Sequence, residues 1–127
     1  MKKFYLLILI IVLVSLFVVL NLSGKSPTNN ITESPLEPNT VEMIEDGFKP
    51  DILAIKVGTT VTFINKDKVF RWPASDLHPT HTIYSEFDPK QPIAPETEWS
   101  FTFNKVGTWN YHDHLSPLLT GKVIVTN

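Results

Sequence analysis

From residues 40–41 onward the sequence is divided into short runs of β-branched and aromatic residues, and this texture limits the folds open to the chain. Gly, Pro, Asn and Asp separate the runs, as in strands joined by tight turns. No segment between them has the 3.6-residue apolar period of a helix. The runs are TVEMIE, DILAIKV, TTVTFIN, HTIY, TEWSFTF, TWNYH and KVIVT. They predict an all-β fold, an antiparallel β-sandwich of Greek-key type.

Alternate positions in three of these runs carry side chains that we expect to share one inward face of a strand. They are Val61 and Phe63, then Trp99, Phe101 and Phe103, then Trp109, Tyr111 and Asp113. The aromatic and aliphatic members should meet in the core. An inward carboxylate on the third strand needs a metal, a histidine or a hydrogen-bond donor beside it, because an isolated buried charge is costly.

The N-terminal residues 1–22 predict a membrane helix. Lys2 and Lys3 precede residues 4–22, which carry no charge, proline or glycine, and a helix that crosses a bilayer needs about 20 apolar residues. We expect an uncleaved, single-pass anchor with a cytoplasmic N-terminus and the remainder on the extracytoplasmic side, periplasmic or extracellular. A cleaved signal peptide, which would release a secreted domain, and a buried core helix are the alternatives.

Residues 23–40, SGKSPTNNITESPLEPNT, are rich in Ser, Thr, Asn and Pro and predict a flexible linker. Residues 41–127 are then the folded domain. The chain has no cysteine, which excludes disulfides and thiolate metal ligands. Its formal net charge of −2 and its lack of basic runs beyond the start argue against a nucleic-acid partner.

All four histidines lie in two short segments, LHPTHTIY and YHDHL. They are His78, His81, His112 and His114. If the sandwich brings the segments side by side, they form a metal site, because imidazole and carboxylate suit Cu(II) or Zn(II). In an extended strand, however, His112 and His114 point away from Asp113, unless the strand ends or bends near His114.

The residues 41–127 resemble the cupredoxin superfamily of plastocyanin, amicyanin and azurin. The resemblance rests on DGFKPDILAIKVGTTVTFIN, HPTHTIY, IAPETEWSFTFNKVGTWNYH and TGKVIV. It implies a Greek-key sandwich with a copper site at one end, and it places His81 at the first histidine ligand. Along an amicyanin-like loop, it also places Asp113 at the cysteine, Ser116 at the second histidine and Leu119 at the methionine. Three of the four type 1 ligands are thus replaced.

The segment GTWNYHDH also resembles the H-x-H copper-binding segment of multicopper oxidases, whose domains are cupredoxins. That resemblance implies His112 and His114 as copper ligands, although the oxidase clusters use histidine pairs from two domains. Trp72, in RWPASDLHPTH, is expected to pack in the domain or to form a wall over the site.

Together these observations predict a membrane-anchored, extracytoplasmic domain that binds copper in a type 2 manner and serves in copper handling or electron transfer, not as an enzyme. His81 and Asp113 lead the expected ligands, His114 and His78 follow, and His112 comes last because alternation turns it outward. The expected partners are the copper ion, a redox or copper-transfer protein and the membrane. The alternatives are a metal-free interaction or structural module and an enzymatic mononuclear copper centre.

Overall fold

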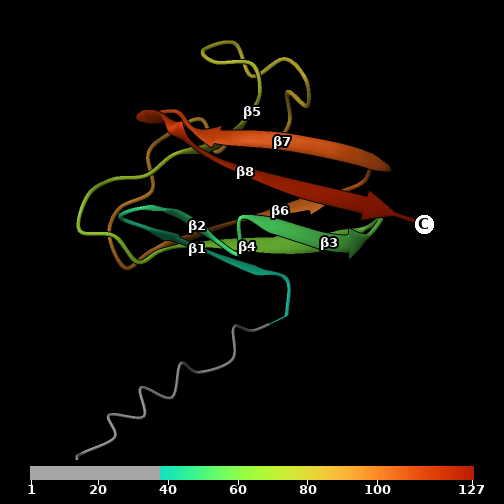
Figure 1. Ribbon diagram of the computed structural model, residues 1–127, viewed down its shortest axis with the longest axis horizontal. Coiled ribbons are helices and arrows are strands. Elements are labelled where there is room, and N and C mark those ends of the chain that lie inside the picture. Colours follow the sequence, from blue (N-terminus) through green and yellow to red (C-terminus); the bar gives the residue numbers. More distant parts are fainter. Residues whose placement is uncertain (1–37) are drawn as a thin grey trace, which may run out of the picture. The chain divides into compact units, whose positions relative to one another are not determined.

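The computed structural model describes residues 38–127, which form eight β-strands and no helix. The strands are β1 (Thr40–Ile44), β2 (Gly47–Lys49), β3 (Ile52–Lys56), β4 (Thr59–Asn65), β5 (Pro73–Ser75), β6 (Glu98–Phe103), β7 (Gly107–Asp113) and β8 (Ser116–Thr126). Two four-stranded sheets have the orders β2-β1-β4-β6 and β3-β8-β7-β5. In Figure 1, β7 and β8 form one layer above β1 and β4 of the other. The predicted all-β sandwich is confirmed.

The sheets are mixed, so the prediction of a purely antiparallel sandwich is wrong in two pairings. β1 runs parallel to β4, and β3 runs parallel to β8. The chain leaves the first sheet after β2, adds β3 to the second sheet and returns as β4 on the free side of β1. Because of these crossings, strands that are not consecutive become neighbours.

The strand predicted for HTIY, residues 81–84, is also wrong. His81 has a φ of 51°, in the left-handed region, and its N–H donates to the Leu77 carbonyl over 2.6 Å. The segment is therefore a turn, and the apolar signal came from the single buried side chain of Tyr84. The sequence patterns also missed β2 and β5, which have three residues each.

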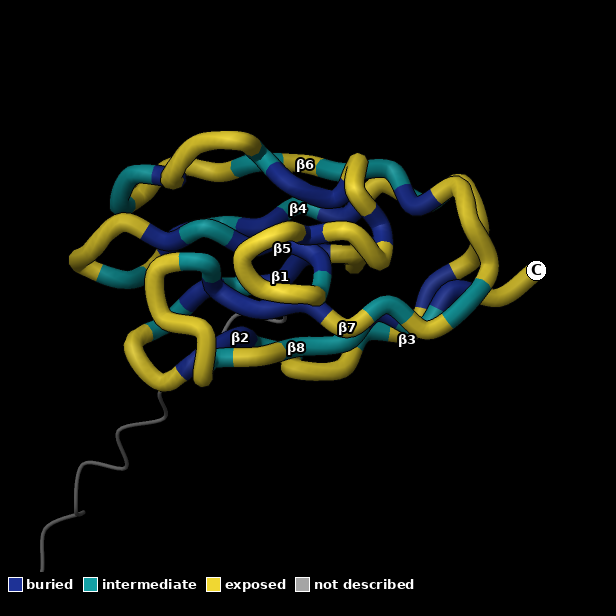
Figure 2. The backbone as a smooth tube through the Cα atoms, turned by 90° about the horizontal axis from the view of Figure 1, so that it is seen from above, coloured by how far each residue is buried: buried dark blue, intermediate teal, exposed yellow. Residues whose placement is uncertain are grey.

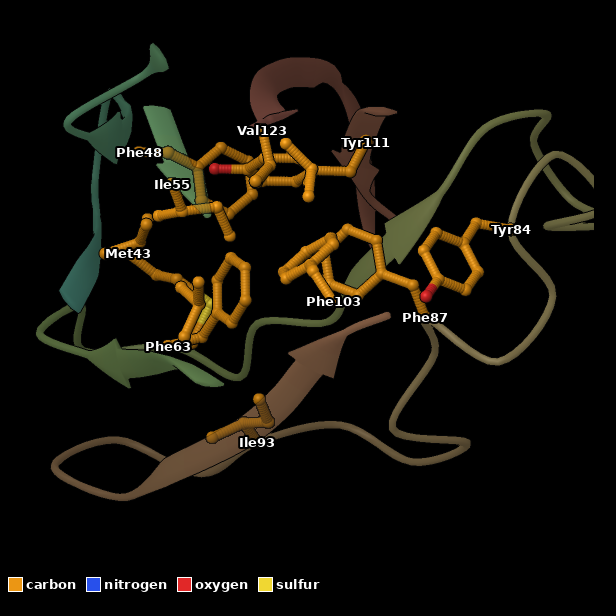
Figure 3. Packing of buried hydrophobic residues seen from close by; sticks show 13 residues of the cluster. Met43, Phe48, Ile55, Phe63, Tyr84, Phe87, Ile93, Phe103, Tyr111 and Val123 are labelled. Carbon is orange, nitrogen blue, oxygen red and sulfur yellow. The ribbon is translucent and has the colours of Figure 1, made fainter. Parts of the chain in front are cut away.

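The core lies between the sheets and is largely aromatic (Figure 3). As predicted, Val61, Phe63, Phe103 and Tyr111 are buried there, and the half-buried rings of their strands pack against them. Phe63 has its ring centroid 5.4 Å from that of Phe87 and 5.5 Å from that of Tyr111. Packing of this kind, with tilted and edge-on rings, stabilises the sandwich beyond the burial of area alone.

The connection between β5 and β6, residues 76–97, belongs to this core even though it has no strand of its own. In Figure 1 its yellow part rises beyond the β7 and β8 layer, and in Figure 2 buried stretches interrupt its exposed turns. Tyr84, Phe87 and Ile93 are its buried anchors. Because these side chains fix the connection, the polar residues between β5 and Tyr84 are held over the outer face of β7.

None of residues 38–127 lies in a helix long and apolar enough to cross a membrane. The predicted membrane helix at residues 1–22 lies outside the described residues, as does most of the predicted linker. The strand β1 begins at Thr40, the last residue assigned to that linker.

The ring of Tyr111 leaves no room for a side chain at Gly121 of β8, its partner across the β7–β8 pair. A Cβ atom at Gly121 would lie 2.3 Å from Cζ and 2.4 Å from the hydroxyl oxygen of Tyr111. The ring cannot move aside easily, since Phe48 lies 4.7 Å from it, centroid to centroid, on another side.

We therefore expect Gly121→Ala to lower the free energy of unfolding by about 1–3 kcal/mol, the usual cost of overpacking. Urea unfolding of the metal-free protein measures it. Thr120→Ala, at the exposed neighbouring position of β8, is the matched control and should change stability by no more than about 0.5 kcal/mol. Equal stabilities of the two variants would contradict the packing described here.

Candidate metal site

The strand β7 places its last residues on opposite faces. Tyr111 and Asp113 point into the sandwich, and His112 points to the outer face, as the alternation predicted. His112 is nevertheless only 2% exposed. The reason is that residues 76–83, which follow β5, fold over this face and bring Asp76 and His78 against the His112 ring.

The strand ends at Asp113, and a two-residue turn, His114 and Leu115, leads directly into β8. The pairing of β7 with β8 shifts register between His112 and Asp113. The N–H of His114 donates to the carbonyl of Trp72 over 2.8 Å. The predicted bend near His114 is therefore present, and it turns the His114 ring toward the outer histidines while Asp113 stays inside.

The structure brings all four histidines together. The ring centroid of His112 lies 5.2 Å from that of His78 and 5.3 Å from that of His81, and the centroid of His114 lies 4.8 Å from each of the same two rings. Trp72 covers one side, with its ring centroid 4.6 Å from that of His114. Trp72 thus forms a wall of the cluster, which is one of the two roles that the sequence left open.

Three of these residues, His78, His112 and His114, each offer a ligand atom within 4.8 Å of the other two. Three nitrogens bound to one metal at about 2.1 Å lie about 3.4–3.6 Å from one another in a tetrahedral or trigonal arrangement, so the three side chains need to close by at most about 1.4 Å. The Nε2 atom of His112 is buried and has no hydrogen-bond partner. An orphaned, buried imidazole nitrogen that faces other imidazoles is what a metal ligand looks like without its metal.

Two carboxylates support the cluster from outside. Asp76 Oδ1 lies 3.0 Å from His112 Nδ1, and Asp88 Oδ2 lies 2.7 Å from His81 Nδ1. Histidine ligands in metal proteins usually hold their second nitrogen in this way, and the carboxylate fixes the ring's tautomer and direction.

Asp88 is the more strongly anchored of the two. The Trp72 indole N–H donates to it over 2.8 Å, and both the backbone N–H and the ammonium group of Lys90 donate to it as well. Burial alone would raise the pKa of Asp88, but the hydrogen bonds from His81, Lys90 and Trp72 outweigh it and hold the pKa well below its usual range. Asp88 is therefore ionised and acts only as an acceptor at neutral pH.

Partial burial and the positive charge that neighbouring histidines would carry lower the pKa of His114. The neighbours are His81, His78 and His112, in decreasing order of effect. The neutral imidazole, which is the form that binds a metal, is thus favoured at His114.

Asp113 is not brought into the histidine cluster. Its Oδ2 atom forms an ion pair with Nε of Arg71 at 2.6 Å, and its Oδ1 atom accepts the backbone N–H groups of Trp72 and Leu115 at 3.0 Å each. The contact between Arg71 and Asp113 is an ion pair without a hydrogen bond, because neither Arg71 Nε nor Asp113 Oδ2 has a hydrogen-bond partner. The partner that an inward carboxylate requires is therefore an arginine.

Sequence reasoning missed Asp76, Asp88 and Arg71. A signal was available for Arg71, the only arginine of the chain, which stands between Phe70 and Trp72. A lone guanidinium in an apolar stretch is typical of a buried ion pair. Asp76 stands two residues before His78, but nothing in the sequence marks Asp88 as its counterpart.

Comparison with known proteins agrees with the fold. No model of a known protein family matches the chain. Amicyanin from Paracoccus denitrificans is 31% identical over 86 residues, which are 67% of this chain and 63% of that protein, so the chain spans less than two thirds of this relative.

Solved structures are similar as well. A purple cupredoxin from Nitrosopumilus maritimus superposes with a TM-score of 0.61 at 24% identity, covering 68% of this chain and 98% of its own. The Cu(I) form of a methionine-to-alanine amicyanin variant superposes with a TM-score of 0.61 at 27% identity, covering 75% of this chain and 88% of its own. The sandwich, its strand order and these similarities show that the chain has the cupredoxin fold.

We expect Asp113→Asn to lower the free energy of unfolding of the metal-free protein by about 3 kcal/mol, because it removes one of the two carboxylates beside the buried Arg71 guanidinium and leaves Asp67 to compensate its charge. Urea unfolding without metal measures this loss. Asp46→Asn, in the exposed β1–β2 turn, is the matched control and should be nearly neutral. An Asp113→Asn protein of unchanged metal-free stability would show that the ion pair does not hold this end of β7.

Proposed function

We propose that the domain binds one copper ion at the histidine cluster on the outer face of β7, without thiolate. The observation that carries this proposal is the buried, unpartnered Nε2 atom of His112, in a residue that offers a ligand atom within 4.8 Å of those of His78 and His114. A structural histidine in a core usually has its polar atoms paired, whereas this buried nitrogen has no partner in a ring that lies beside other imidazoles.

The choice of copper rests on the donor atoms and on the relatives. Imidazole nitrogen suits Cu(II), and it also suits Zn(II), so zinc is the competing ion. The related amicyanin has been solved in a Cu(I) form. Because the chain has no cysteine, the bound copper would lack the thiolate bond of a type 1 site and would behave as a type 2 centre.

Asp113 does not belong to the ligand set that we propose, because Arg71 and two backbone N–H groups already occupy its carboxylate. Asp113 stands where the family resemblance places the cysteine ligand, and on this inner face it forms an ion pair with Arg71. The proposed site therefore lies on the other face of the same strand.

We further propose that residues 1–22 anchor the domain on the extracytoplasmic side of a membrane. There it would handle copper or transfer electrons, together with a redox or copper-transfer partner. The support is the length of the uncharged run at residues 4–22 and the two lysines before it.

The full-length protein should take up one Cu(II) per chain and remain pale, without the strong visible absorption of a copper–thiolate bond. His112→Ala and His114→Ala should each abolish stoichiometric uptake. Ser116→Ala is the matched control, since Ser116 is exposed and forms no side-chain hydrogen bond in the described structure, although the family resemblance placed a ligand there. Metal analysis after copper exposure measures uptake, and a wild type that retains none would favour the metal-free module instead.

Copper binding should weaken as the pH falls from 7 to 5. An imidazole of ordinary pKa, about 6.5, loses roughly 20- to 30-fold of its neutral fraction over this range, and each ligand must be neutral to bind. Because the pKa of His114 is lowered, this imidazole loses its neutral form mainly at the acidic end of the range. Calorimetric titration at both pH values measures the effect, and equal affinity would argue against imidazole ligands.

If residues 1–22 are an anchor, the mature protein keeps them. Mass spectrometry of protein extracted from membranes should give the mass of a chain that still includes residues 4–22. A mature N-terminus between residues 23 and 40 would show instead that the segment is a cleaved signal peptide.

A further inference from the structure

Among the four histidines, His81 alone has both ring nitrogens occupied by side chains. Its Nδ1 atom lies 2.7 Å from Asp88 Oδ2, and its Nε2 atom lies 2.9 Å from His114 Nδ1. The side chain is 5% exposed, so the ring has little room to turn. His81 is also absent from the group of three residues whose ligand atoms converge.

The two carboxylates determine the tautomers of three rings. Ionised Asp88 only accepts, so His81 carries its proton on Nδ1 and presents a lone pair on Nε2. His114 must then donate from Nδ1 to that lone pair. A carboxylate oxygen accepts in the same way at Asp76, so the Nδ1–H group of His112 donates to Asp76 Oδ1.

A consistent set of lone pairs results from this chain of hydrogen bonds. His114 and His112 each retain an unprotonated Nε2 atom, and that of His112 is buried and unpartnered. His78 is exposed, and neither of its nitrogens has a hydrogen-bond partner within residues 38–127. Three imidazoles are thus prepared to bind a metal, and the fourth is not.

We propose that His81 does not bind the metal but orients His114, so that the protein supplies three imidazole ligands, His78, His112 and His114, and leaves a coordination position for a small exogenous ligand. The inference rests on the proposed copper site. It reassigns His81, the first ligand by family resemblance, as a positioning residue that acts through His114 and is itself held by Asp88.

The environment of the cluster agrees with access for a small ligand. Trp72 packs against His114 and donates to the anchored Asp88, whereas the side of the cluster formed by His78 is exposed. Cu(II) commonly binds more than three donors, so water or a small anion can complete the set. Azide is the probe that we would use.

The first test uses the metal-free, full-length protein. Long-range 1H–15N spectra distinguish the tautomers of each imidazole. We expect His81, His112 and His114 all to carry the proton on Nδ1 at neutral pH. A proton on Nε2 of His114 or His112 would overturn the inference without any reference to copper.

The second test uses copper-loaded protein. Pulsed electron paramagnetic resonance should detect three coordinated imidazoles in the wild type and still three in His81→Gln, whose amide oxygen can accept the His114 Nδ1–H. His81→Leu, which cannot accept, should bind copper about 10- to 100-fold more weakly, the usual effect of losing an outer partner. Azide should perturb the spectra of the wild type and of His81→Gln.

The outcomes separate the two proposals. Four imidazoles in the wild type, falling to three in His81→Gln, would overturn the role given to His81 but leave copper binding at the cluster intact. A spectrum that azide does not alter would contradict the open position. A wild type that takes up no copper would overturn both proposals.

Discussion

The contact between Arg71 and Asp113 is the interaction on which this end of the sandwich depends. It joins β7 to the chain that precedes β5, and Arg71 also donates to the carbonyl of Ile44 and to Asp67. The other oxygen of Asp113 accepts from Trp72 and Leu115. One buried carboxylate thus fixes both the residue that walls the histidine cluster and the turn that carries His114.

This arrangement explains how a domain of cupredoxin fold can keep an ordered end to its sheet without a cysteine. The resemblance places Asp113 where the family has its thiolate ligand, and an ion pair now fills the inner space. Breaking such a pair is costly even where the intact pair adds little net stability. The carboxylate at the inner position already has Arg71 and two backbone N–H groups as partners, while the outer face of β7 offers imidazoles that the fold brings within reach of one another.

Much of the fold could be predicted from the sequence, because strand alternation is a local property. Phe63, Phe103 and Tyr111 were placed in the core by their spacing alone. The direction of strand pairing could not be predicted in this way, since it depends on where the chain crosses between sheets. The segment with Tyr84 looked like a strand because one anchoring aromatic residue and its β-branched neighbours imitate the pattern.

The site was predicted in part. Clustering of histidines in two segments indicated that they would meet, and they do. Strand alternation correctly predicted that His112 points away from the core. It could not predict that residues 76–83 would cover that face and bury the ring. The hydrogen bonds of Asp76 and Asp88 depend on how this irregular connection folds, and short-range sequence patterns carry no information about that.

The proposed copper site lies on the outer face of β7 and not beside Asp113. A crystal structure of the copper-loaded, full-length protein, with anomalous scattering recorded at the copper edge, tests this most directly. We predict a single anomalous peak at bonding distance from the Nε2 atoms of His112 and His114, with the Arg71–Asp113 contact intact. A peak on the inner face, bound to Asp113 with Arg71 displaced, would contradict this location of the copper site.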